Sequence, residues 1–151
     1  MSATPIIHRL EQMVRLPARR KLLLLEAGTR LLWWRLLLAL LPFRRIARRL
    51  ERPRTGGCQP ARAAADSGRA QDIGWAIAAA ARNGPWPMHC LPQALAATAM
   101  LRARAIPATL YIGANPSQQG FAGHAWVVAA GVYVCGGQAS AHMPVFTRYS
   151  C

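Results

Sequence analysis

Two residues 34 positions apart, Cys90 and His124, have the types that nucleophilic chemistry requires. Pro92 is tolerated in the first turn of a helix but not in its interior, and residues 91–104 are rich in Leu, Ala, Met and Arg. A helix is therefore expected to begin at Cys90. Unpaired backbone N–H groups and the positive end of the helix dipole would stabilise a thiolate there and donate to an oxyanion. Cys90 is thus a candidate nucleophile.

The histidine belongs to the elements that follow this helix. The helix should end near Ala105, because Pro107 favours extended geometry in the residue before it. The elements expected next are a strand over 108–112, a loop over 115–120, and strands over 124–129 and 132–135 joined at 130–131. His124 would open a strand after the cysteine-bearing helix, which is the arrangement of a nucleophile and its general base.

Short segments around these two residues stand in a characteristic order. They are Cys90-Leu91, Ala94-Leu95-Ala96, Leu101-Arg102-Ala103-Arg104-Ala105-Ile106-Pro107-Ala108, Ile112-Gly113 and His124-Ala125-Trp126-Val127. The ordered set resembles the transglutaminase-like leader peptidase of lasso-peptide biosynthesis, the cysteine protease half of the B protein of the microcin-processing type. The resemblance covers roughly residues 20–137, and the stretch ending in Leu40-Leu41-Pro42-Phe43-Arg44-Arg45 looks like that family's N-terminal helices.

The resemblance implies a fold, an activity and partners. The fold would be α+β and papain/transglutaminase-like, with N-terminal helices and a catalytic helix packed on a small antiparallel sheet. Cys90 matches the family's nucleophile and His124 its base. In that family the enzyme removes the leader from a ribosomally made precursor peptide, a separate leader-binding protein grips the leader, and an asparagine-synthetase-like cyclase closes the macrolactam ring. Nothing here resembles the winged-helix leader-binding module, and no cofactor is expected.

The third catalytic group of the family is missing from its usual place. The family carries an aspartate on the strand after the histidine, where this chain reads Val-Tyr-Val-Cys-Gly-Gly-Gln over 132–138, and no Asp or Glu follows Asp72. Gln138 is the candidate substitute, since an amide can orient an imidazole, as in Cys-His-Asn proteases. The alternatives are Asp66 or Asp72 brought round by the fold, a backbone carbonyl, or water.

Three further side chains are candidates for substrate contact. Trp86 lies four residues before Cys90, where it could line a cleft or donate its indole N–H to the oxyanion; a buried core tryptophan is the alternative. His89 neighbours Cys90, but adjacent side chains at a helix start seldom face each other, so we assign it to the substrate rather than to the base. Trp126, in the motif of His124, is the third candidate.

Length and charge divide the chain. With 151 residues, 53% of them hydrophobic, one compact domain with a real core is expected. The net charge is +14, of which +10 falls in residues 1–54 and +4 in residues 55–151. We interpret residues 1–54 as a basic Leu/Arg-rich helical region, 55–70 as a linker, and 71–151 as the catalytic region, with a short helix over 72–82.

The leucine-rich stretch from Leu22 to Leu41 has the length of a membrane span, but Glu26, Arg30 and Arg35 interrupt it. Each charge at a bilayer centre costs roughly 2.5 to 3.5 kcal/mol, so a transmembrane helix is disfavoured. Glu26 and Arg30 should pair at i,i+4. A helix so widely apolar must bury against the chain's own core or a partner protein. The alternative is a membrane surface, for which Trp33, Trp34 and the arginines at 44, 45, 48 and 49 are suited.

Other classes of function have little support. The arginine clusters show no zinc-finger spacing, helix-turn-helix or aromatic stacking platform, so nucleic acid is not expected. The cysteines at 58, 90, 135 and 151 form no C-x-x-C pair, which argues against a zinc site. Without a secretion signal, a cytoplasmic location is expected, peripheral at the inner membrane face under the membrane alternative, with free thiols. Two alternatives to the peptidase stay open: a transglutaminase-like acyl transferase and a non-catalytic scaffold.

Overall fold

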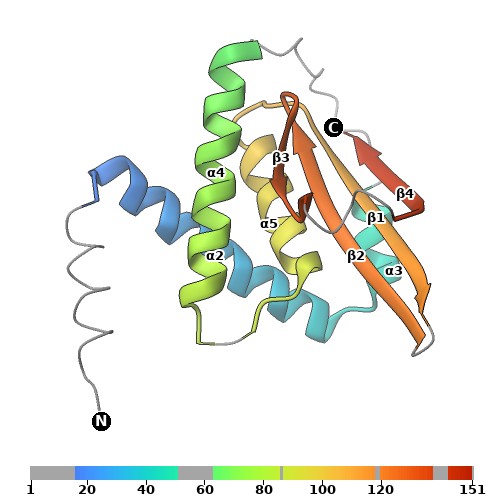
Figure 1. Cartoon of the computed structure of the whole chain (residues 1–151). Coiled ribbons are helices and arrows are strands. Elements are labelled where there is room, and N and C mark those ends of the chain that lie inside the picture. The colour runs from blue at the N-terminus through green and yellow to red at the C-terminus, as the bar shows by residue number, and fades with distance from the viewer. Residues whose placement is uncertain (1–15, 51–62, 86, 118–119, 138–142, 151) are drawn as a thin grey trace.

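The computed structural model describes residues 16–50, 63–85, 87–117, 120–137 and 143–150. The helices within them are α2 (Ala18–Leu40), α3 (Phe43–Leu50), α4 (Ala63–Asn83) and α5 (Cys90–Arg102). The strands are β1 (Ala108–Ser117), β2 (Gly120–Ala129), β3 (Val132–Cys135) and β4 (Val145–Ser150). They form one sheet in the order β3-β2-β1-β4, and every paired neighbour is antiparallel. The predicted α+β class, with helices packed on a small antiparallel sheet, is confirmed (Figure 1).

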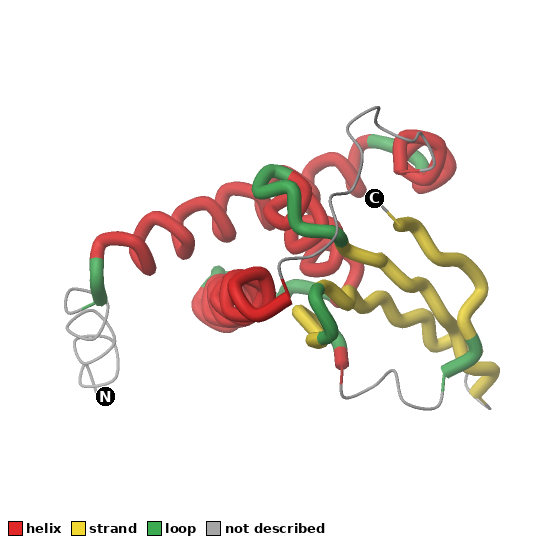
Figure 2. The backbone as a smooth tube through the Cα atoms, turned by 90° about the horizontal axis from the view of Figure 1, so that it is seen from above, coloured by secondary structure: helices red, strands yellow, loops and turns green. Residues whose placement is uncertain are grey.

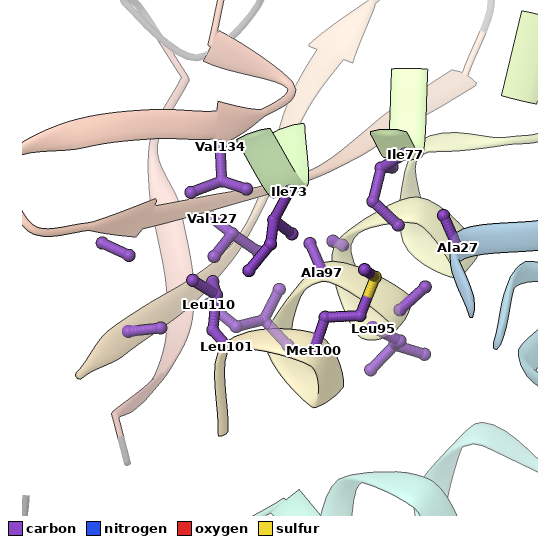
Figure 3. Close-up of a cluster of buried hydrophobic side chains, with 14 of the residues drawn as sticks. Ala27, Ile73, Ile77, Leu95, Ala97, Met100, Leu101, Leu110, Val127 and Val134 are labelled. Atoms are coloured by element: carbon purple, nitrogen blue, oxygen red, sulfur yellow. The ribbon is translucent and has the colours of Figure 1, made fainter. Parts of the chain in front are cut away.

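Helix α5 is the centre of the molecule. It contacts α2 and α4 on one side and the three strands β1, β2 and β3 on the other. It is buried along almost its whole length, and Figure 3 shows Leu95, Ala97, Met100 and Leu101 among side chains from the other elements. A helix that is apolar all round needs cover on every side. Its buried residues are Pro92, Ala94, Leu95, Ala96, Ala97, Thr98, Met100 and Leu101.

Helix α2 agrees closely with the apolar stretch predicted over 22–41. It follows Pro17 and ends at Leu40, two residues before Pro42, which the helix could not have included without losing a hydrogen bond. Leu23, Ala27 and Leu31 are buried against α4 and α5. Within the described residues, no helix combines the length and apolar composition needed to cross a membrane.

Helix α4 corrects the predicted linker. Residues 55–70 were expected to be irregular and a helix to begin near Asp72, yet α4 begins at Ala63; residues 55–62 lie outside the described part. The alanines at 63–65 favour helix, and Gly68 costs too little to interrupt it once Ala70 is buried completely. At Gly74, an added Cβ would lie 2.5 Å from the carbonyl oxygen of Val134, so the missing side chain lets α4 approach β3.

The hairpin of β1 and β2 is longer than predicted. A loop was expected over 115–120, but β1 continues to Ser117 and pairs in unbroken register with β2, from Ala108 opposite Ala129 to Ser117 opposite Gly120. His124 is therefore the fifth residue of β2 rather than its first. Strand β3 has the predicted bounds, and β4, which the sequence did not suggest, pairs with the other edge of β1.

One ion-pair cluster joins the N-terminal helices to the catalytic region. Glu26 accepts from Arg30 at 3.0 Å, as predicted for an i,i+4 pair, and from the two terminal nitrogens of Arg104 at 2.6 and 3.3 Å. The hydrogen bond from Arg104, with the charges of Arg104 and Arg30, holds the pKa of Glu26 below its usual value although burial opposes this. Side chains from both predicted regions also share one hydrophobic cluster, so the two regions are packed as a unit.

Glu26→Gln should lower the free energy of unfolding at neutral pH by about 1 to 2 kcal/mol, because it removes the bidentate, charge-assisted interaction with Arg104. The folded-state pKa of Glu26 is depressed, so its contribution is present above the unfolded-state value of about 4.3. That contribution is lost as the pH falls through the folded value. Urea unfolding at neutral pH and at about pH 3 should show the gap between wild type and variant closing on acidification.

Asp72→Asn is the matched control for this prediction. Asp72 pairs with Arg19 at 3.5 Å, and the Arg19 side chain is 70% exposed, so this pair should contribute a few tenths of a kcal/mol at most. Equal losses in the two variants would contradict the role assigned to Glu26.

Candidate active site

Cys90 occupies the first position of α5, as predicted. Its preceding residue, His89, caps the helix with extended backbone at φ −67° and ψ 165° and makes no side-chain capping bond. The thiol is half-buried, and Pro92 lies in the first turn. The backbone N–H groups of this turn have no partner within the helix and give this end of α5 a positive partial charge. They are suited to stabilising a thiolate and an oxyanion.

Two side chains fix the segment that leads into Cys90. Arg35 of α2 donates to the carbonyl oxygen of Pro87 at 3.0 Å, and Gln93 of α5 donates to that of Met88 at 2.8 Å. Consecutive carbonyls are thus held from two different helices. The approach to the nucleophile is therefore anchored to the N-terminal helices, although α2 lies far from Cys90 in the sequence.

The thiol reaches the edge of strand β2. Sγ of Cys90 lies 3.9 Å from the carbonyl oxygen of Gly123, the residue just before His124. Strand β3 pairs with β2 only at residues 127–129, so residues 120–126 pair with β1 alone and their other edge is open to side chains. The structure therefore brings the candidate nucleophile to the part of the strand that carries the candidate base.

The imidazole of His124 is held by a backbone carbonyl. Its Nε2 lies 2.9 Å from the oxygen of Gly136, in the segment that follows β3. Because a carbonyl oxygen only accepts hydrogen bonds, Nε2 carries the proton in the neutral imidazole and Nδ1 has the free lone pair. Nδ1 is thus the atom that could take a proton from the thiol. Within the described residues, the partner of the imidazole is therefore a backbone carbonyl, one of the alternatives weighed from the sequence.

Gly136 is required at this position. Its φ is +72°, a conformation that side chains rarely tolerate, and an added Cβ would lie 2.7 Å from the carbonyl oxygen of Ala125 and 3.0 Å from Nε2 of His124. A side chain would therefore push against the imidazole that the carbonyl orients. A carbonyl acceptor has no sequence signature of its own, because every residue carries one.

An aromatic stack supports the other side of the site. Trp126 stacks on His124 with ring centroids 6.0 Å apart and on Tyr111 at 5.5 Å. Trp126 is only 4% exposed, so its ring serves mainly as a support for the imidazole, and its contact with a substrate stays a prediction. Tyr111, directly opposite Trp126 in the register, was not singled out from the sequence.

The two candidate catalytic groups approach the strand edge from opposite faces of the sheet. His124 shares a face with Trp126, whereas Ala125 and Val127 point into the core that contains α5. In the part of the chain that is described, thiol and imidazole make no hydrogen bond with each other. Catalytic hydrogen bonds are often incomplete before substrate binds, so the missing bond does not by itself argue against a catalytic pair.

The remaining predicted residues lie elsewhere. Gln138 and Trp86 fall outside the described residues, so their roles stay predictions. His89 is exposed beside Cys90, which leaves it accessible to a substrate. Asp72 is paired with Arg19, and neither it nor Asp66 is a hydrogen-bond partner of His124. In the described chain, no group of three or more His, Cys, Asp or Glu side chains could hold a metal ion.

A second cysteine lies near the site but differs in chemistry. Cys135 of β3 pairs in register with Val127. Burial raises the pKa of the Cys135 thiol to about 12; negative charge on Cys90 adds to the increase, and a hydrogen bond from the Val127 backbone partly offsets it. The Cys135 thiol therefore stays protonated at neutral pH and is not a competing nucleophile.

A groove of about 490 Å³ lies elsewhere, between α2, α4 and Arg104. Its lining includes Leu22, Glu26 and Ile73 and none of the residues around Cys90 and His124. Volume alone therefore does not mark the candidate active site, which is an open strand edge rather than a deep pocket.

A cysteine at the start of a core helix and a histidine on the adjoining antiparallel strand are the elements of the papain/transglutaminase-like class. Comparison with protein-family models agrees: the model of the transglutaminase-like superfamily matches residues 32–148, most of the chain, and the protein belongs to this superfamily. Comparison with curated proteins and with solved structures gave no match. Membership indicates cysteine-dependent hydrolysis or acyl transfer as the class of chemistry and leaves the substrate unassigned.

Native-state alkylation should distinguish the two described cysteines. Iodoacetamide at about pH 8 followed by peptide mapping should label Cys90 well before Cys135, because a pKa of about 12 leaves a thiolate fraction of about 10⁻⁴ at that pH. In urea both should react, which controls for peptide recovery. Labelling of native Cys135 as fast as Cys90 would contradict the assignment.

Gly136→Ala should displace the imidazole of His124 and destabilise the fold by about 2 to 4 kcal/mol, from positive-φ strain and close contacts together. Nitrogen-15 NMR should show the Nε2-protonated tautomer of His124 in the wild type and its loss in the variant. His124→Ala identifies the signal among the other histidines.

Gly131→Ala is the matched control. Gly131 has a similar φ of +77° but nothing within 4 Å of an added Cβ, so it isolates backbone strain, roughly 1 to 2 kcal/mol. It should leave the His124 signal unchanged. An unchanged signal in Gly136→Ala would show that the carbonyl does not set the tautomer.

Proposed function

We propose that this protein is a cysteine peptidase that removes the leader from a ribosomally made lasso-peptide precursor. The observation that carries the catalytic half of the proposal is the environment of His124. Its Nε2 donates a hydrogen bond to a backbone carbonyl, so Nδ1 is the basic atom of the ring. Cys90 reaches the edge of the same strand. Membership of the transglutaminase-like superfamily supports the same chemistry. The substrate rests on the ordered segments from Cys90 to Val127 and their resemblance to lasso leader peptidases.

The proposed reaction proceeds through an acyl-enzyme. Nδ1 of His124 takes the proton from Cys90, and the sulfur adds to the carbonyl carbon of the leader–core bond. Backbone N–H groups in the first turn of α5 bind the oxyanion. The C–N bond then breaks as the imidazolium gives its proton to the leaving amine. Water, activated by the imidazole, hydrolyses the thioester to a carboxylate and regenerates the thiol.

The missing aspartate has a specific consequence for this mechanism. A carbonyl dipole can orient the imidazole and accept its Nε2 proton, but it stabilises the imidazolium less than a full negative charge would. We expect the peptidase to be slower than one with a complete triad.

On the resemblance to lasso leader peptidases, we also propose a separate leader-binding protein, and a cyclase that acts on the released core, as its partners.

Two other functions can be distinguished from the peptidase by a cleavage assay with the precursor peptide. Acyl transfer to an amine uses the same thioester, and a non-catalytic scaffold is favoured by the observation that Cys90 and His124 make no hydrogen bond with each other. A primary amine added to the assay distinguishes transfer from hydrolysis by the mass of the product.

Mass spectrometry of the precursor, incubated with the leader-binding protein and this enzyme, should show cleavage that Cys90→Ala and His124→Ala each reduce by at least 10³-fold. Cys135→Ala removes a nearby thiol that the mechanism does not use and should retain activity. A precursor left intact by the wild type would reject the peptidase, and the same product yield from Cys90→Ala would favour the scaffold.

A further inference from the structure

Helix α2 has a second apolar face that none of the described residues covers. Its large side chains are exposed, from 40% for Leu32 to 78% for Leu40. At about 100° per residue, they lie within an arc of about 100° on the helix surface. We call this set the exposed stripe; it consists of Leu22, Leu25, Thr29, Leu32, Trp33, Leu36 and Leu40.

The stripe is continuous although it contains one polar residue. The hydroxyl of Thr29 binds the carbonyl oxygens of Leu25 and Glu26 at 3.0 and 2.9 Å, so its polar group is satisfied within the helix. From Leu22 to Leu40 the stripe extends about 27 Å at 1.5 Å per residue. It is therefore a long apolar surface rather than a set of isolated leucines.

The stripe faces away from the rest of the molecule. The buried residues Leu23, Ala27 and Leu31 lie about half a turn from it and pack against α4 and α5. Figure 2 shows α2 along the margin of the molecule, and its main contacts are with α4 and α5 rather than with the sheet. The surface is therefore convex, formed by the outer side of a single helix, and the groove between α2 and α4 lies on its flank.

Positive charge brackets both ends of the stripe. Residues 18–50 hold nine Lys and Arg and one acidic residue, Glu26, a net charge of +8 from 9 − 1. Glu26 is already bound by Arg30 and Arg104. The exposed cations at the two ends are Arg19, Arg20, Lys21, Arg44, Arg45 and Arg48. A second copy would place cations against cations in either orientation, so the occupant must be anionic.

We propose that α2 and α3 form a docking face for an anionic lipid surface. The leucines and Trp33 of the exposed stripe enter the boundary between headgroups and acyl chains, and the flanking arginines bind lipid phosphates. A convex, tryptophan-bearing face suits a deformable lipid interface, whereas an acidic protein helix would need a groove to lie in. The proposal is independent of the catalytic assignment, because none of these side chains binds Cys90 or His124.

Vesicle flotation with the full chain tests the proposal. The wild type should bind vesicles that contain roughly a third phosphatidylglycerol and not vesicles of phosphatidylcholine alone. The triple variant Leu25→Ser/Trp33→Ser/Leu36→Ser should bind at least tenfold more weakly, as should Arg44→Gln/Arg45→Gln/Arg48→Gln. Val145→Ser, which removes an exposed apolar side chain from β4, is the matched control and should bind like the wild type.

Brominated acyl chains provide the second readout. Quenching of tryptophan fluorescence on binding should be lost in Trp33→Phe, because Trp33 is the large aromatic of the stripe. All substituted positions are exposed, so unchanged urea midpoints should show that each variant folds. Absence of binding to anionic vesicles, or binding that the apolar variant leaves intact, would overturn the proposal; recovery of an acidic protein in place of vesicles would do the same.

Discussion

The structure depends on the need to cover helix α5 on every side. Eight of its thirteen residues are buried, and four residues of the helix are alanines, so neighbouring elements can approach closely. The sheet covers one side, and α2 and α4 cover the other. Its first residue, Cys90, reaches a part of the edge of β2 that is not paired with β3. Helix α5 is thus buried for stability along its length, whereas its N-terminus, which carries the candidate nucleophile, lies at a partly open site.

The candidate active site is built largely from backbone groups. The carbonyl of Gly123 contacts the thiol, the carbonyl of Gly136 accepts from the imidazole, and the nucleophile stands in the first turn of α5, where backbone N–H groups lack helical partners. Strand pairing and helix geometry hold these backbone groups in place, so their positions do not depend on the aspartate that this chain lacks. The site is consequently sensitive to backbone conformation, above all at Gly136, and less dependent on an acidic residue than a triad would be.

The N-terminal helices combine an internal and an external role. One face of α2 contributes to the core, and its two flanks carry Glu26, which binds Arg104, and Arg35, which holds the segment before Cys90. The opposite face keeps its leucines and Trp33 exposed. Because α2 is apolar on two faces, its sequence resembles a membrane span. Its charged residues nevertheless make insertion into a bilayer unfavourable.

Local signals in the sequence determined much of this protein. Pro92 and the residues after it located the start of α5 at Cys90, the alternation of residues 132–135 defined β3, and Pro42 marked the end of α2. Tertiary structure decided what these signals could not encode. Asn115 and Pro116 favour a turn, but unbroken pairing with β2 keeps them in a strand. The partner of His124 is a carbonyl, a group that every residue carries, so only the path of the chain after β3 could select Gly136.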